Sequence, residues 1–593
     1  MRHRTAFWIM MAMLGLGLAN GACRPREVTV ESPPTPPATL EKATVVIEQQ
    51  TVQAVLTSTP TPIPEGGMIT QATFADATTA NPLYAADDAS RLMGSLMFEG
   101  LLRLDPLTGA FAPGLAEGWT ISDDDRTYTF AIRRNMQWSD GRPITAHDFY
   151  FTYAALLSGE LDTPNNELVA NISRIEVADD YTAVVVFRQA HCDNMESLQL
   201  GWIPMHAFTD DADQYDWSRL ATHEFNGMPT AFSGPFVLKD WVRGDHWTQV
   251  RNTRYWRGAP HLEGVVTRVL SGQAEMVDLL KKGGIDIGAD ISPQYLAELE
   301  QLPGLQLYRF PSDRYDFVGL QLGDPSDPQP RLGPNGQVNP KHGEHPILKD
   351  KRVRQAIVYA LDREGIIATV LQGQGILLQA NVLPTVGWAY NTDLEPRGYD
   401  PEKAQALLNQ AGWVLNEAAG IRYKDGLPLK LRLHTNAGNS VREAMGALIQ
   451  AQLAKVGIKV ELILVEYDVL LDVLLGQTFD MVLTSWSHLG MNPDDTRLWS
   501  AASDVPGEGS NFVSYYSPEV EAWLAEASTV PGCDQDRRAT LYRQIQARLY
   551  EDQPYVWLDM PRNLTVISRR LGGINPEPWD IRYDINQWHI TGK

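Results

Sequence analysis

The stretch AEGWTISDDDRTYTFAIRRNMQWSDGRPITAHDFYFTY, residues 116–153, constrains the fold of this chain most. Three consecutive aspartates at 123–125 supply turn chemistry, and residues 127–132 then place an apolar or aromatic side chain at every second position. Thr145 stands where it can cap a helix that begins at the next residue. The pattern therefore predicts strand, turn, strand, loop and helix, and none of these residues is arranged for catalysis.

The length and charge of the chain narrow the possibilities further. A chain of 593 residues is too long for one hydrophobic core, so we expect two or three domains. The apolar fraction of 44% and the charged fraction of 21% are typical of globular proteins. The formal net charge of −23 argues against nucleic acid as a partner, because phosphate binding needs a basic patch.

The N-terminal residues have the pattern of a targeting segment. Two arginines precede an uncharged, largely apolar run at 6–19, which is too short to span a bilayer comfortably. Small residues and then Cys23 follow, so the pattern predicts a lipoprotein signal peptide over 1–22 and a lipid attached to Cys23. An ordinary signal peptide cut near Ala22, or an uncleaved anchor, stays open because Asn20 stands where such signals usually carry leucine.

Residues 23–66 have the composition of a tether. They contain two Pro-Pro pairs and the run TSTPTPIPE with almost no aromatic residues, so they cannot bury a core. Fully extended, the segment could reach roughly 140 Å at about 3.3 Å per residue. We expect it to separate the lipid anchor from the globular part of the chain.

Helix signals alternate with strand signals in the C-terminal half. Asp400 and Pro401 suit the N-cap and first position of a helix that ends before a glycine. Ser440 and Glu443 predict a capping box for a second helix, and an apolar strand at 458–462 follows it directly. Helix followed closely by strand indicates an α/β lobe.

Several blocks along the chain resemble one family. In order, they are WSDGRPITAHD at 138–148, SGPF at 233–236 with NTRYW at 252–256, RVRQAIVYALDRE at 352–364, YDPEKAQALLNQAGW at 399–413 and FDMVLTSW at 479–486. Together they resemble the family 5 extracellular solute-binding proteins, the dipeptide-, oligopeptide- and nickel-binding receptors of ABC importers. The resemblance covers essentially the whole chain after the tether.

The resemblance implies an α/β, two-lobed periplasmic-binding-protein fold with a hinge and an extra subdomain in the first lobe. On that layout, lobe I comprises 67–95, 205–312 and 563–593, the extra subdomain 96–204, and lobe II 313–562. Hinge closure would enclose the ligand between the lobes. Cys192 and Cys533 would fall in different lobes, where a bond would hinder closure, so we expect two unpaired, buried thiols, although an exported protein permits a disulfide.

The function implied by the resemblance is capture and delivery without catalysis. The expected protein is a monomeric, lipid-anchored binding component on the outer face of the cytoplasmic membrane, periplasmic or extracellular, which passes a small-molecule or peptide ligand to an ABC permease. No GxSxG, HExxH, Walker A or CxxC motif indicates an enzyme, and no cofactor is expected. His342, Glu344 and His345 could be imagined as metal ligands, but their turn-rich surroundings favour a solvated loop, so we predict no metal site. A receptor that presents ligand to a membrane signalling protein stays open as an alternative.

The loop after the apolar strand 481–483 is the most pointed candidate for ligand contact, because clefts gather at the C-terminal ends of such strands. In peptide-binding members of the family, an aspartate three residues after the tryptophan pairs with the peptide α-ammonium group. Here that position is Leu489, which cannot satisfy a buried ammonium. The resemblance therefore implies weak peptide binding, or another polar ligand such as an oligosaccharide stacked on Trp486, unless Asp494 or Asp495 takes the missing role.

The predicted ligand-binding residues come from four segments, and each has a plainer alternative. Trp486 could be a core tryptophan, Asp88 could serve the dipole of a helix N-terminus, and Asn436 lies just before a helix where capping is the ordinary role. The predicted set is Trp486, Ser487, His488, Asn492, Asp494, Asp88, Ser90, Trp388 and Asn436.

Overall fold

The computed structural model describes residues 40–47, 50–57, 63–105, 107–487, 489–576 and 580–591. The predicted signal peptide, the lipidation site Cys23 and the predicted ligand contact His488 lie outside the described residues. Within the described ranges, no helix combines the length and the apolar character needed to cross a membrane.

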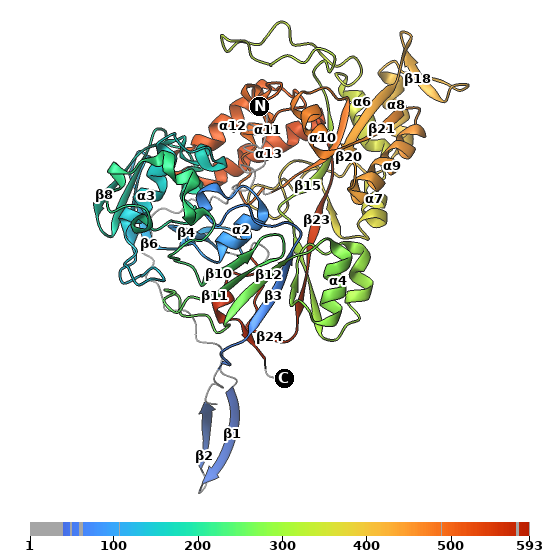
Figure 1. The fold of residues 1–593 in the computed structure, drawn as a ribbon. Coiled ribbons are helices and arrows are strands. Elements are labelled where there is room, and N and C mark those ends of the chain that lie inside the picture. The colour runs from blue at the N-terminus through green and yellow to red at the C-terminus, as the bar shows by residue number, and fades with distance from the viewer. Residues whose placement is uncertain are drawn as a thin grey trace.

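Part of the predicted tether forms a β-hairpin. Strand β1 (Leu40–Ile47) pairs antiparallel with β2 (Gln50–Thr57). Figure 1 shows this hairpin at a distance from the other strands and helices. The two segments are rich in valine and threonine, which favour strands.

One large sheet runs through the molecule. Its main path is β10-β11-β12-β3-β13-β23-β15-β22-β20-β21, and β14 and β16 also pair with β23. The strands are β3 (Met68–Thr73), β10 (Phe236–Val242), β11 (His246–Arg251), β12 (Gly264–Val269), β13 (Ile287–Gly288), β14 (Leu305–Pro311), β15 (Tyr315–Leu320), β16 (Gly375–Leu377), β20 (Lys430–Asn436), β21 (Lys459–Val465), β22 (Met481–Trp486) and β23 (Tyr555–Ser568).

The strand β23 is shared by the two halves of this sheet. Its first residues pair with β15, with Gly319 opposite Tyr555. Its later residues pair with β14, from Pro311 opposite Arg562 to Leu305 opposite Ser568. Figure 1 shows β23 as one long strand that passes from the upper half of the sheet to the lower half. A single strand therefore connects the predicted lobe II to lobe I.

Helices cover the half of the sheet that belongs to lobe II. They are α6 (Lys351–Ala360), α7 (Arg363–Val370), α8 (Pro401–Gln410), α9 (Ser440–Ala454) and α10 (Tyr467–Leu475). The predicted cap of α8 is confirmed, because the Asp400 side chain accepts a hydrogen bond from the backbone N–H of Lys403. The predicted cap of α9 is wrong by one residue: Asn439 caps the helix, and Glu443 accepts from the N–H of Gly438 at 2.8 Å.

The most constraining stretch of the sequence folds as predicted. Strands β6 (Ala116–Ile121), β7 (Thr127–Ile132), β8 (Ile172–Asp179) and β9 (Thr182–Phe187) form a separate sheet in the order β6-β7-β9-β8. The alternating residues Tyr128, Phe130 and Ile132 are buried. Thr145 and Asp148 form a capping box at the start of α3 (Ala146–Leu157). This small sheet with α3 belongs to the predicted extra subdomain.

The two cysteines form a disulfide, so the prediction of two free thiols is wrong. Cys192 follows β9 in the extra subdomain, and Cys533 lies between α12 (Pro518–Thr529) and α13 (Gln535–Asp552) in lobe II. Their Cα atoms are 5.5 Å apart. The prediction held that a bond between the lobes would hinder closure. The end of α12 nevertheless lies against the subdomain, and the N–H of Cys192 donates to the carbonyl of Ser528 at 2.8 Å.

Candidate functional site

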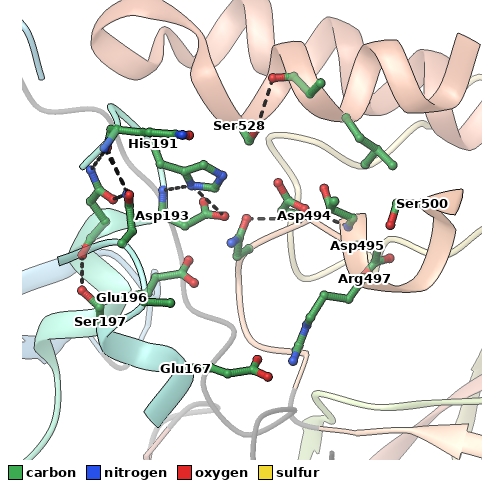
Figure 2. Close-up of a pocket in the computed structure, with 18 of the residues that line it drawn as sticks. Glu167, His191, Asp193, Glu196, Ser197, Asp494, Asp495, Arg497, Ser500 and Ser528 are labelled. Atoms are coloured by element: carbon green, nitrogen blue, oxygen red, sulfur yellow. Dashed lines mark hydrogen bonds and ion pairs between the residues drawn. The ribbon is translucent and has the colours of Figure 1, made fainter. Parts of the chain in front are cut away.

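A cavity of about 520 Å³ lies between the extra subdomain and lobe II (Figure 2). The subdomain contributes residues around the short helices η2 (Pro164–Val169) and η3 (Asn194–Leu198), and lobe II contributes the loop after β22, the helix α11 (Thr496–Trp499) and α12. Carboxylates predominate among the charged lining residues, with His191 and Arg497 as the basic ones. The lining carboxylates are Glu167, Asp193 and Glu196 from the subdomain and Asp494, Asp495 and Glu521 from lobe II.

Three side chains meet at the boundary between the extra subdomain and lobe II. Potential ligand atoms of His191, Asp193 and Asp494 all lie within 4.8 Å of one another. Figure 2 shows Asp193 and Asp494 on opposite sides of the cavity, on segments that are far apart in the sequence. The backbone N–H of Asp193 donates to Nδ1 of His191 at 3.3 Å. A guanidinium nitrogen of Arg538, on α13, lies 3.5 Å from a carboxylate oxygen of Asp193.

Negative charge is crowded in this cavity. Burial raises the pKa of Asp193, and the neighbouring Asp494 carboxylate adds to that effect. Burial also raises the pKa of Asp495 to about 7, even though Asn381 donates a hydrogen bond to this carboxylate at 2.6 Å. Carboxylates that are expensive to ionise together gain from a cation placed between them.

Asp494 retains unused capacity to accept hydrogen bonds. One of its oxygens accepts from the N–H of Thr496 at 2.8 Å. The other oxygen, Oδ2, is buried and has no hydrogen-bond partner among the residues that the structure describes. The arrangement around Asp193 and Asp494 could therefore hold an ammonium or guanidinium group, and with His191 it offers the donor atoms of a metal site.

Some of the residues predicted from the loop after β22 line the cavity, and others do not. Asn492 and Asp494 line the cavity as predicted, and Leu489 lines it too. Trp486 is the last residue of β22 and is 3% exposed, within a core cluster. Its ring stacks on Phe512 at a centroid distance of 5.3 Å, and its indole N–H donates to the Tyr555 hydroxyl at 3.2 Å. Neither Trp486 nor Ser487 is among the residues that line the cavity.

The remaining predicted residues lie outside the lining of this cavity. Asp88 is exposed at the start of α2 (Asp88–Ser95) and pairs with Arg91 at 2.5 Å. Ser90 is buried and its hydroxyl accepts from two backbone N–H groups. Asn436 accepts from Arg442 at 2.7 Å. Trp388 lies beneath Arg538, whose guanidinium carbon is 5.4 Å from the ring centroid, so it supports the cavity from behind.

The two histidines of the turn-rich loop have structural partners. His345 accepts hydrogen bonds at Nδ1 from the N–H groups of Ile347 and Leu348, and its Nε2 lies 3.2 Å from Asp480. Nε2 of His342 lies 3.2 Å from Asp504. These contacts attach the loop to the body of lobe II.

Sequence reasoning missed the subdomain side of the cavity. His191, Asp193 and Glu196 belong to no recognisable motif, and their partners in lobe II lie about three hundred positions away in the chain. The signal that was available is the segment His191-Cys192-Asp193, in which a cysteine of an exported protein is flanked by two polar, titratable residues.

Comparison with known proteins identifies the family. The model of the bacterial extracellular solute-binding proteins, family 5 Middle, matches residues 110–508. This chain belongs to that family. The family 5 protein is 27% identical over 533 residues to the oligopeptide-binding protein AppA of Bacillus subtilis, covering 89% of this chain and 92% of the relative. It is 25% identical to the nickel-binding periplasmic protein of Escherichia coli over 82% of this chain and 87% of the relative.

Solved structures confirm the fold. The structure of Bacillus subtilis AppA in complex with a nonapeptide is 26% identical, covers 89% of this chain and 100% of its own, and has a TM-score of 0.70. The substrate-binding protein CtaP of Listeria monocytogenes, 21% identical over 89% of this chain and 100% of its own, has a TM-score of 0.74 and supports the fold alone. The predicted two-lobed periplasmic-binding-protein fold is therefore confirmed. The family 5 protein is a substrate-binding protein of the ABC-importer type, and its relatives are solute-binding proteins rather than enzymes.

Proposed function

We propose that this family 5 protein is the lipid-anchored binding component of an ABC importer, and that it captures a cationic, peptide-like ligand between its lobes for delivery to a permease. The family assignment supports capture of a solute outside the cytoplasm. The anchor rests on the signal pattern that ends at Cys23. We also propose that the protein is monomeric and does not catalyse a reaction, and its solute-binding relatives support the second point.

The ligand class rests on one observation, the pair of carboxylates Asp193 and Asp494 that face each other from the two lobes. Leu489 removes the carboxylate that the peptide-binding relatives carry at that loop position. The sequence leaves open that Asp494 or Asp495 takes the missing role. Asp494, five residues further along the same loop, supplies a carboxylate oxygen that is buried without a partner among the described residues, so it replaces the lost anchor for an ammonium group.

An oligosaccharide ligand and a role in signalling have less support than this proposal. An oligosaccharide was expected to stack on Trp486, but that ring is buried against Phe512 and Phe317. The names of the relatives in Bacillus subtilis and Escherichia coli refer to oligopeptide and nickel as ligands. No contact favours the presentation of ligand to a signalling protein over delivery to a permease.

Calorimetry with a pool of short peptides tests the proposal. We expect binding that depends on a free amino group, so acetylation of the amino termini should weaken it. Asp494→Asn should lower the affinity by about one to two decades, because a charge-assisted hydrogen bond contributes roughly 1.5–3 kcal/mol. Asp88→Asn is the matched control, since Asp88 is exposed and absent from the cavity lining, and it should leave the affinity unchanged.

Two results would contradict the proposal. One is peptide affinity that is indifferent both to acetylation and to Asp494→Asn. The other is tight binding of Ni²⁺ added alone that is lost in Asp494→Asn while peptides do not bind, which would make His191, Asp193 and Asp494 a metal site instead.

A further inference from the structure

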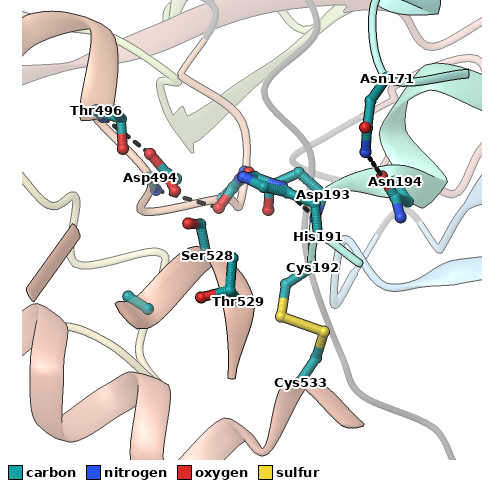
Figure 3. A network of polar contacts seen from close by, with 12 residues as sticks. Asn171, His191, Cys192, Asp193, Asn194, Asp494, Thr496, Ser528, Thr529 and Cys533 are labelled. Carbon is teal, nitrogen blue, oxygen red and sulfur yellow. Dashed lines mark hydrogen bonds and ion pairs between the residues drawn. A yellow bond between two sulfur atoms is a disulfide. The ribbon is translucent and has the colours of Figure 1, made fainter. Parts of the chain in front are cut away.

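The disulfide Cys192–Cys533 lies at the edge of the ligand cavity and crosses from one lobe to the other. Figure 3 shows the bond beside His191, Asp193 and Ser528. These three residues line the cavity, and the first two flank Cys192 in the chain. The covalent link is therefore placed where the extra subdomain and lobe II must separate if the cavity is to open on this side.

The other contacts along this edge are reversible. The N–H of Cys192 donates to the carbonyl of Ser528 at 2.8 Å, and the N–H of Gly532 donates to the carboxylate of Asp125 at 2.8 Å. The charged groups of Asp193 and Arg538 are 3.5 Å apart. Hydrogen bonds and an ion pair of this kind open and re-form as the lobes move, whereas the disulfide does not.

The two sulfur atoms differ in their surroundings. Cys192 is buried, with 5% of its surface exposed. Cys533 is partly exposed and lies between Gly532 and Asp534, both of which are exposed. Because a reductant has to reach a sulfur atom in order to attack it, the geometry favours attack at Sγ of Cys533, with Cys192 as the leaving thiolate.

We propose that Cys192–Cys533 is a redox-controlled latch on the ligand cleft. In the oxidised protein the bond holds the extra subdomain against lobe II. A ligand can then enter or leave only through motions that keep this contact intact. An external dithiol opens the latch in two steps. Its first thiolate forms a mixed disulfide with Cys533 and releases the Cys192 thiolate, and its second thiolate then releases Cys533. The protein gains two electrons and two protons, and the reductant becomes a disulfide.

The effect on ligand exchange rests on the proposed function, but the effect on lobe separation does not. When the disulfide is oxidised, the two lobes stay close together whether or not a ligand is bound. Reduced, they separate when ligand is absent and close again around it by hinge motion. The latch therefore controls whether the cleft can open, and it leaves the contacts that recognise the ligand unchanged.

Small-angle scattering of the ligand-free protein tests the latch without reference to any ligand. Peptide mapping under non-reducing conditions first establishes that Cys192 and Cys533 are linked in the secreted protein. We expect a larger radius of gyration after treatment with a dithiol. The double variant Cys192→Ser/Cys533→Ser should match the reduced form and should not respond to the dithiol. Free thiols in the secreted protein, or identical scattering of the oxidised and reduced wild type, would overturn the proposal.

Two further measurements complete the test. If the double variant does not fold, hydrogen exchange of residues 528–533 in the wild type serves instead: faster exchange on reduction supports the latch, and unchanged exchange refutes it.

For a bound peptide, reduction should raise the dissociation rate by about tenfold, because affinity differences at one site lie mainly in dissociation. If no peptide binds either form, the proposed ligand is wrong, while scattering still decides the latch.

Discussion

At the residue scale, the main feature of the cavity is the group of carboxylates that line it. Asp193 and Asp494 approach each other from different lobes, and Asp495 stands behind them with Asn381 as its hydrogen-bond donor. Burial and the neighbouring Asp494 carboxylate raise the pKa of Asp193, and burial raises the pKa of Asp495, so both carboxyl groups resist ionisation. A cationic ligand favours the ionised form of these carboxylates. Part of its affinity therefore comes from carboxylates that the fold already holds in place around the cavity.

Asp495 should make the stability of the folded protein depend on pH. Its pKa is about 7 in the folded protein, mainly because of burial, and near 4 in an unfolded chain. The folded state therefore favours the protonated carboxyl, and the contribution of Asp495 to stability is greatest below about pH 4 and is lost as the pH rises to about 7. Asp495→Asn fixes a neutral side chain, so it should raise the melting temperature at pH 8 and change it little near pH 4.

The expected gain for Asp495→Asn in the free energy of unfolding at pH 8 is roughly 4 kcal/mol at most, at 1.36 kcal/mol per pKa unit. Thermal unfolding followed by circular dichroism at both pH values measures it. The exposed Asp210→Asn is the control and should show no difference between the two pH values. A gain of equal size at both pH values would show that packing, rather than charge, is responsible.

At the element scale, local signals in the sequence were sufficient where one segment determines its own structure. Residues 127–132 alternate and become β7, and Asp400 with Pro401 starts α8 as predicted. The start of α9 differs because Asn439, Ser440 and Glu443 can each accept a backbone N–H, and only the path of the chain after β20 decides which one does. The sequence predicts a loop at Trp486 because its apolar run ends at Leu483, whereas pairing with β15 extends β22 to Trp486.

The α9 cap can be tested directly. Asn439→Ala removes the side chain that accepts from the N–H of Arg442 at 3.1 Å, so it should lower the free energy of unfolding by about 1 kcal/mol. Ser440→Ala is the matched control and should cost little, because Ser440 is exposed and is the first helical residue rather than the cap. Urea unfolding of both variants makes the comparison, and a larger loss for Ser440→Ala would restore the cap that the sequence suggested.

At the scale of the whole molecule, the two-lobed fold could be predicted because blocks that resemble family 5 run through essentially the whole chain after the tether. The cavity and the disulfide could not, because both depend on contact between the extra subdomain and α12, which no local pattern encodes. The argument against the disulfide treated the two lobes as bodies that must separate freely. The contact between Cys192 and Ser528 shows that they also touch outside the hinge.

The membrane anchor is a whole-molecule prediction that rests on the sequence. Cys23→Ser removes the sulfur that the predicted signal would lipidate, so the mature variant should leave the membrane fraction. Fractionation of cells followed by mass determination of the N-terminus tests this expectation. Release into the soluble fraction supports lipid anchoring at Cys23, and an unprocessed variant that stays in the membrane indicates an ordinary anchor instead.

The position of β23 in the sheet has a consequence for the order of folding. This strand comes late in the sequence, yet it pairs with β14, β15 and β16, which come much earlier. Neither half of the large sheet can be completed until β23 arrives. Pairing over such long sequence separations makes folding slow and leaves strand edges exposed meanwhile. A nearly complete sheet with unpaired edges is therefore vulnerable to aggregation until its shared strand is inserted.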